Sequence, residues 1–197
     1  MTRFVDRGAV FASWVGVGMA ATVVVSFVLV IPIEFLVGPC ALLGGMLIGY
    51  YANARSERAG GPWSRVILNA LLAGVVTGVT YAVLLLGVKA IFFNADDGYP
   101  DFNRVDQTTG QKTPPLCDTG ADCVYQRYLA IPGRADAFQA AGITNLEQFT
   151  QFYWSEQFST SGLMIGLSVV GALAGGAMFG MANRRKPETA RAGTPAV

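Results

Sequence analysis

The sequence predicts an all-α membrane protein: a four-transmembrane-helix bundle with a long extracytoplasmic loop. Its 197 residues are 52% hydrophobic and only 14% charged, whereas a soluble domain carries about 25% charged residues. The charged residues are segregated, and four long stretches hold almost none. This is expected of membrane spans, because a charged side chain is costly in the hydrocarbon core of a bilayer. These stretches are continuous and lack the alternation of barrel strands, which favours helices.

The first span is predicted at residues 9–33, after Arg3 and Arg7 and before Glu34. A cleaved signal peptide is the competing interpretation, but its apolar core would be only about 7–15 residues, followed by a small-residue cleavage site. This stretch is longer and ends in bulky residues. We therefore expect a retained membrane anchor.

Three further apolar stretches approach or exceed the roughly 20 residues that span a bilayer. They cover residues 38–54, 66–93 and 162–182. The expected organisation is residues 1–93 with three spans, an extracytoplasmic loop at 94–161, a fourth transmembrane helix at 162–183 and a disordered cytoplasmic tail at 184–197.

Orientation follows from the basic residues near the span ends. On one side these are Arg3, Arg7, Arg55, Arg58, Arg65, Arg184, Arg185, Lys186 and Arg191. Residues 94–161, on the other side, are rich in aspartate. Both termini are therefore predicted to be cytoplasmic. The 11 arginines against 3 lysines favour a GC-rich bacterial source, and thus the cell (inner) membrane.

The outer segment contains two cysteines, Cys117 and Cys123, six residues apart. An oxidising compartment would join them in a disulfide, and the spacing differs from the CxxC redox motif. Cys40 lies alone within the second span and is expected to be a small buried residue. The acidic stretch at 94–101 lacks the order of ligands in an EF-hand, so a solvated loop is favoured over a calcium site.

The end of the outer segment has a helical pattern. A short helix is expected at 136–141, ended by Gly142, and Thr144 with Glu147 matches a capping box for the next helix. Apolar and aromatic residues then recur at helical spacing: Ile143, Leu146, Phe149, Phe152, Tyr153 and Phe158. This predicts an amphipathic helix in the outer headgroup region; docking on a partner or covering the bundle mouth are the alternatives.

The second and fourth spans resemble each other. The stretch from Ala41 to Gly49 reads ALLGGMLIG, and the stretch from Ala172 to Gly180 reads ALAGGAMFG. Two parallel helical-hairpin repeats, related by a two-fold axis along the membrane normal, would explain the resemblance. Convergence of two glycine-rich bilayer helices is the alternative.

Glycines recur four residues apart in three of the spans, which places each pair on one helix face and lets another helix backbone approach closely. The pairs are Gly45 and Gly49, Gly74 and Gly78, Gly162 and Gly166, Gly171 and Gly175, and Gly176 and Gly180. The pattern predicts tight helix packing within the chain, with an oligomer or a larger complex as the alternative.

Glu34 and Lys89 are charges at the outer ends of their spans. They are interpreted as an interfacial pair with Lys89 extending to the headgroups, and an ion or proton site is the alternative. Polar residues on the third span, Asn69, Thr77, Thr80 and Tyr81, are expected to form interhelical hydrogen bonds.

The sequence favours a non-catalytic function. It has no histidine, which excludes histidine-based metal, haem and nucleophile chemistry, and the net charge of +1 does not favour nucleic acid. No cofactor or metal is expected, and an enzyme is disfavoured. We expect a structural or accessory subunit of a membrane complex whose partners are the lipid bilayer and other membrane subunits or further copies of itself. A small oligomeric transporter or channel is the alternative.

Overall fold

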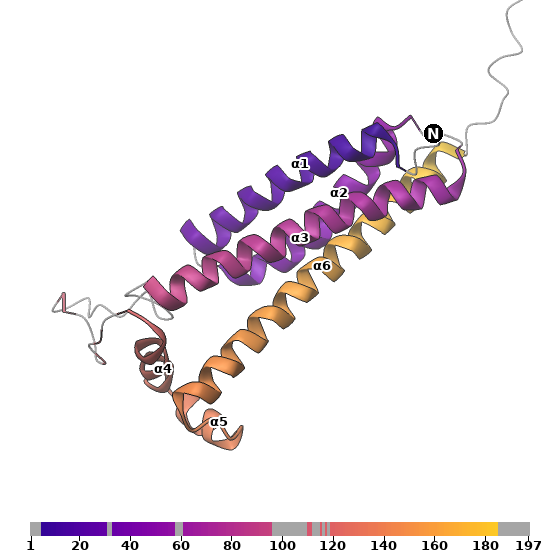
Figure 1. The fold of residues 1–197 in the computed structure, drawn as a ribbon. Helices are drawn as coiled ribbons and strands as arrows, with labels where there is room; N and C mark the ends of the chain where they lie inside the picture. Colours follow the sequence, from indigo (N-terminus) through magenta and orange to yellow (C-terminus); the bar gives the residue numbers. More distant parts are fainter. Residues whose placement is uncertain are drawn as a thin grey trace, which may run out of the picture. The chain divides into compact units, whose positions relative to one another are not determined.

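The structure, a computed structural model, describes residues 5–30, 33–57, 61–95, 110–111, 115, 117 and 119–184. This part of the chain is all-α (Figure 1). The long helices are α1 (Arg7–Val24, continued by a π-helical segment, Val25–Val30), α2 (Val37–Arg55, preceded by a 3₁₀ turn, Glu34–Leu36), α3 (Trp63–Ala95) and α6 (Leu146–Arg184). Between α3 and α6 lie the short helices α4 (Ala121–Leu129) and α5 (Arg134–Ala140).

The four long helices are long and apolar enough to cross a membrane, at Arg7–Val30, Glu34–Arg55, Trp63–Ala95 and Leu146–Asn183. They pack as a bundle whose outer surface carries many large apolar side chains. Trp14 is 71% exposed and Val170 is 60% exposed. A surface so rich in apolar groups suits hydrocarbon rather than water, so the chain is a multi-pass membrane protein with four candidate spans, as the sequence predicted.

The chain forms two compact units. The bundle unit comprises Met1–Ala82 and Leu163–Val197, and the loop unit comprises Val83–Gly162. The long helices α3 and α6 each contribute to both units. At about 1.5 Å per residue, the 33 residues of α3 and the 39 of α6 are longer than the roughly 30 Å hydrocarbon core requires.

Small side chains form the core of the bundle unit. Ala9 and Ala12 of α1, Ile48 and Ala52 of α2, and Ala73 of α3 make one buried cluster. Alanine side chains let helix axes approach closely, so the packing depends on small residues as well as on the glycines.

The loop unit is organised around Phe149, whose side chain is fully buried. Its ring centroid lies 4.9 Å from that of Tyr125 and 5.3 Å from that of Tyr128, both on α4. It lies 5.7 Å from Phe138 of α5. The aromatic face that the sequence predicted is therefore covered at Phe149 by protein rather than by lipid headgroups.

Helix α5 ends as its sequence requires. Gly142 has a positive φ of 74°, which glycine adopts without strain. The amide of Gly142 donates to the carbonyl of Gln139, and the amide of Ile143 donates to the carbonyl of Phe138. This is a Schellman ending, and Phe138 and Ile143 are both buried beside it.

The start of α6 differs from the predicted capping box by one residue. The cap is Asn145, whose Oδ1 accepts a hydrogen bond from the Gln148 amide at 2.9 Å. Gln148 reaches back to the amide of Thr144 at 2.8 Å. Asparagine caps as well as or better than threonine, so Asn145 and Gln148 take the roles predicted for Thr144 and Glu147.

Two features of the loop region were not anticipated. Helix α4 had no prediction, and α6 runs without a break from Leu146 to Arg184. The predicted amphipathic helix and the fourth span are thus parts of one helix. The predicted disordered tail lies outside the described residues beyond Arg184.

Candidate helix-association surfaces

The closest helix contact joins α2 and α6 through four glycines. A Cβ added at Gly45 would lie 2.9 Å from the carbonyl carbon of Ser168, and one at Gly49 would lie 2.6 Å from that of Ala172. Conversely, a Cβ at Gly171 would meet the backbone of Leu42 at 3.0 Å, and one at Gly175 the backbone of Met46 at 2.8 Å. Each helix therefore presses its glycines against the other's backbone, which any larger residue would prevent.

A second glycine-lined contact joins α3 and α6. A Cβ at Gly74 would lie 2.6 Å from the Ala172 side chain, and one at Gly78 would lie 2.9 Å from Ile165. The Ser168 hydroxyl donates a hydrogen bond of 3.1 Å to the Gly74 carbonyl. Helix α6 thus uses one side against α2 and another against α3.

The remaining glycines of α6 divide into two groups. Added Cβ atoms at Gly176 and Gly180 would meet Ala70 at 2.8 Å and the Trp63 ring at 2.7 Å, both on α3. Gly162 and Gly166 are exposed, and nothing in the described chain would meet an added Cβ within 4 Å. Of the five pairs identified in the sequence, this is the one whose added Cβ atoms would meet no helix of the described chain.

The α2 and α6 contact has a local two-fold pattern, but its register differs from that of the sequence resemblance. In the contact, Gly45 and Gly49 correspond to Gly171 and Gly175. In the sequence alignment, Gly45 corresponds instead to Gly176, which lies five residues after Gly171. The aligned glycines also face different helices, since Gly45 faces α6 and Gly176 faces α3. The contacts therefore give the duplication no support, and it stays a prediction.

Glycines outside the four-residue pairs also make close contacts. A Cβ at Gly8 would lie 2.6 Å from the backbone of Arg55, and Gly16 faces the Thr77 hydroxyl. These positions belong to a stripe of small residues on α1, which continues at Ala12 and Ala20. The signal was present in the sequence, but it appears only when alanine is counted with glycine.

Buried polar side chains gather near the start of α3. Asn69 is fully buried, and its Oδ1 accepts from the Asp6 amide at 3.2 Å. Its Nδ2 donates to the Asp6 carboxylate at 2.7 Å. Asn53 is also fully buried and donates to the carbonyl of Val66 at 3.1 Å and to that of Gly49 at 3.0 Å. This polar cluster ties α1, α2 and α3 together.

Thr77 and Tyr81 lie about two and three turns further along α3 than Asn69, and both are fully buried. Neither hydroxyl has a hydrogen-bond partner in the described chain, so the predicted interhelical hydrogen bonds are not formed there. Thr80 instead donates to the Val76 carbonyl of its own helix at 2.8 Å. Because Gly16 brings α1 against the Thr77 hydroxyl, the packing is tight at this level.

The two charges predicted to pair belong to different compact units. Glu34 is exposed and starts the turn before α2, in the bundle unit. Lys89 is in the loop unit and is only 4% exposed, and its backbone carbonyl accepts from the Tyr153 hydroxyl at 3.4 Å. Such burial differs from the predicted extension of Lys89 into open headgroups. The ion pair itself stays a prediction.

The loop unit contains the predicted disulfide between Cys117 and Cys123, with the two Cα atoms 5.5 Å apart. Arg127 of α4 is buried and donates to the Cys117 carbonyl at 3.2 Å, so the bridge and this arginine hold the same turn. Cys40 is a free cysteine and half-buried. Among the described residues, no three acidic or cysteine side chains are grouped to hold a metal ion; residues 96–101 lie outside them.

Comparison with protein-family models, with curated proteins and with solved structures finds no match to this chain. Its function is therefore argued from the surfaces of the molecule itself.

Proposed function

We propose that the chain is a non-catalytic structural or accessory subunit of a membrane complex, and that Gly162 and Gly166 of α6 receive a helix of another subunit or of a second copy. The observation that carries the proposal is the open space beside these two glycines. A glycine inside a helix costs about 1 kcal/mol relative to alanine. The other pairs gain close helix contacts in return, and a partner helix would give this pair the same gain.

The proposal places the chain in the cell (inner) membrane with both ends in the cytoplasm. It is supported by Arg7, Arg55 and Arg65 at one end of the bundle unit, as the positive-inside rule expects. A membrane-impermeant maleimide should then label Ala135→Cys in intact cells, in a Cys40→Ser background. Glu57→Cys should react only after permeabilisation, and the reverse pattern would refute this orientation.

The test of the subunit role is Gly166→Ile. Extraction of the wild type in mild detergent should give an assembly larger than one chain, of defined subunit composition. Gly166→Ile should release the single chain, because a branched side chain would hold a partner helix away. Its thermal stability as a single chain should not fall, since a Cβ added at Gly166 would meet nothing within 4 Å in the described chain and isoleucine is a better helix former than glycine.

The matched control is Gly18→Ile. Gly18 of α1 is also exposed, and an added Cβ there would also meet nothing within 4 Å, but it has no glycine four residues away. This variant should keep the assembly. A wild type that runs as a single chain with no stoichiometric partner would refute the proposal.

The second candidate is a small oligomeric transporter or channel. The buried hydroxyls of Thr77 and Tyr81 favour it, because unpartnered polar groups inside a bundle are typical of substrate or ion paths. The tight contact of Gly16 with Thr77 argues against an aqueous path at that level. Loss of an uptake or flux activity on substitution of Glu34 or Lys89 would favour transport.

A further inference from the structure

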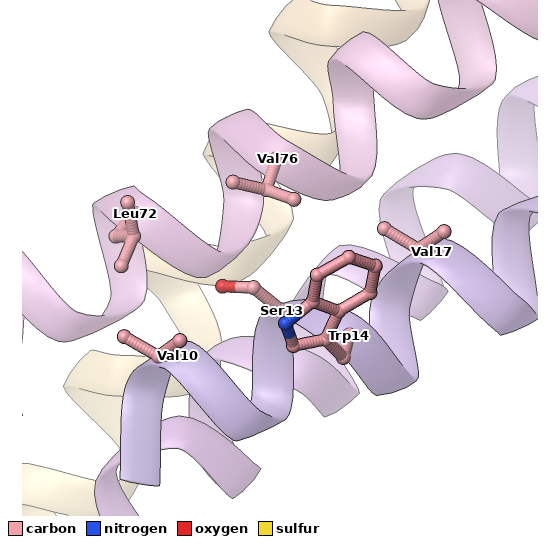
Figure 2. A pocket seen from close by; sticks show the side chains of 6 residues that line it. All are labelled: Val10, Ser13, Trp14, Val17, Leu72 and Val76. Carbon is pink, nitrogen blue, oxygen red and sulfur yellow. The ribbon is translucent and has the colours of Figure 1, made fainter. Parts of the chain in front are cut away.

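An apolar groove of about 270 Å³ runs between α1 and α3 in the bundle unit. Figure 2 shows Val10, Ser13, Trp14 and Val17 of α1 on one wall and Leu72 and Val76 of α3 on the other. The only hydroxyl in this lining is that of Ser13, and it donates to the Ala9 carbonyl of its own helix at 2.9 Å. The hydroxyl in the lining therefore already has a hydrogen-bond acceptor and does not need one from an occupant of the groove.

The size of the groove favours a slender occupant. An α-helix with its side chains is about 10–12 Å across and rises 5.4 Å per turn, so one turn fills roughly 420–610 Å³. A whole turn of helix therefore cannot lie inside the groove, and a docking helix would only insert side chains across its rim. A lipid acyl chain is much thinner than a helix and could lie inside, between Val10 and Val76, rather than across the rim.

Two exposed arginines lie near the start of α1, where Val10 of the groove lining also lies. Arg7 is exposed and seven residues before Trp14, which puts both on nearly the same stripe of α1, about 10 Å apart along the axis. Arg55 is exposed and places its guanidinium 5.6 Å from the Phe11 ring centroid, on the same part of α1. Its backbone lies against Gly8, next to Arg7.

The charge at this end suits an anionic headgroup. The acidic residues described here are Asp6 and Glu57, and the Asp6 carboxylate is already hydrogen-bonded to Asn69. Arginine is suited to phosphate because its planar fork can donate two hydrogen bonds at once. Basic residues at the membrane surface attract anionic lipids.

We propose that this end of the bundle unit binds an anionic phospholipid, with an acyl chain in the α1/α3 groove and the phosphate at Arg7 and Arg55. The site is independent of the helix surface at Gly162 and Gly166. Either proposal can therefore fail without the other.

Trp14 provides the test because it lines the groove. The protein is placed in phosphatidylcholine nanodiscs that contain a small fraction of dibrominated phosphatidylglycerol or of dibrominated phosphatidylcholine, which quench tryptophan on contact. The Trp14 signal is the difference between the wild type and Trp14→Phe. We expect phosphatidylglycerol to quench Trp14 at a lipid fraction about 25-fold lower than phosphatidylcholine does at low salt, with about fivefold from each of the two arginines.

The double variant Arg7→Gln/Arg55→Gln should remove this preference and leave quenching by phosphatidylcholine unchanged. The matched control, Arg134→Gln on α5, changes an exposed arginine of the loop unit and should keep the preference. Val76→Phe should narrow the groove and weaken quenching by both lipids, and circular dichroism of each variant checks that the helices form.

Three outcomes would overturn the proposal. Equal quenching by the two brominated lipids would mean that the groove takes bulk lipid without recognising the headgroup. Quenching by neither would mean that protein, such as a second copy of the chain, covers Trp14. A preference that survives in the double variant would place the headgroup elsewhere.

Discussion

At the scale of single residues, hydrogen bonds from buried amide side chains connect the helices of the bundle unit. Asn69 and Asn53 are fully buried, and each hydrogen-bonds to a neighbouring helix. An amide can be buried at modest cost when its donors and acceptors are used. An isolated charge would cost far more. These two asparagines therefore hold three helices in one register.

Asn69→Leu should destabilise the protein by about 1–2 kcal/mol, because it removes the hydrogen bonds that Asn69 makes to the amide and to the carboxylate of Asp6. The measurement is unfolding by SDS titration in mixed micelles. Asn94→Leu is the matched control, because Asn94 is exposed and donates only to a carbonyl of its own helix, that of Ala90. Equal losses in both variants would mean that the polar cluster contributes nothing specific.

At the scale of helices, the decisive contact is that between α2 and α6. Gly49→Ala should destabilise the protein by about 1–3 kcal/mol, the usual cost of overpacking. The reason is that the new Cβ would lie 2.6 Å from backbone atoms of Ala172. Backbone in a helix cannot move aside as a side chain can, so the two helices must separate. The same SDS titration measures the loss.

Gly166→Ala supplies the control for this prediction, because it makes the same chemical change on an open face of α6. In the isolated chain it should be neutral or stabilise by up to about 1 kcal/mol, as expected for alanine in a helix. If Gly49→Ala and Gly166→Ala changed the stability equally, helix propensity rather than helix packing would determine the stability change at both positions.

The four long helices were predictable from the sequence, because composition sets the length and place of a membrane span. Residues that depend on three-dimensional neighbours were not. The cap at Asn145 competes with Thr144 one residue earlier, and both are good caps. The partners of Gly45 and Gly176 differ although their sequence contexts agree, because identical motifs can face different helices. Helix α4 follows the disulfide turn and has a buried face at Cys123, Val124 and Arg127. With nine residues, it is shorter than the window of roughly 11–18 residues in which helical periodicity is recognised.

At the scale of the whole molecule, the chain consists of two compact units with different kinds of core. The bundle unit packs alanines and glycines, whereas the loop unit packs aromatic rings around Phe149 beside a disulfide. The disulfide closes a short ring that ends in the first turn of α4, at Cys123. The stabilisation that the disulfide contributes should therefore be confined to the loop unit.

Reduction of the disulfide should speed hydrogen exchange of the α4 amides while leaving those of α2 unchanged. In the loop-entropy model such a ring contributes roughly 2.4 kcal/mol, so exchange in α4 should accelerate by up to about 50-fold. Cys123→Ser should reproduce the effect without reductant, which separates it from any action on Cys40, the free cysteine of α2. Faster exchange in both α2 and α4 would mean that the units open together. Unchanged exchange in both would mean that Arg127 and the aromatic cluster hold α4 without the bridge.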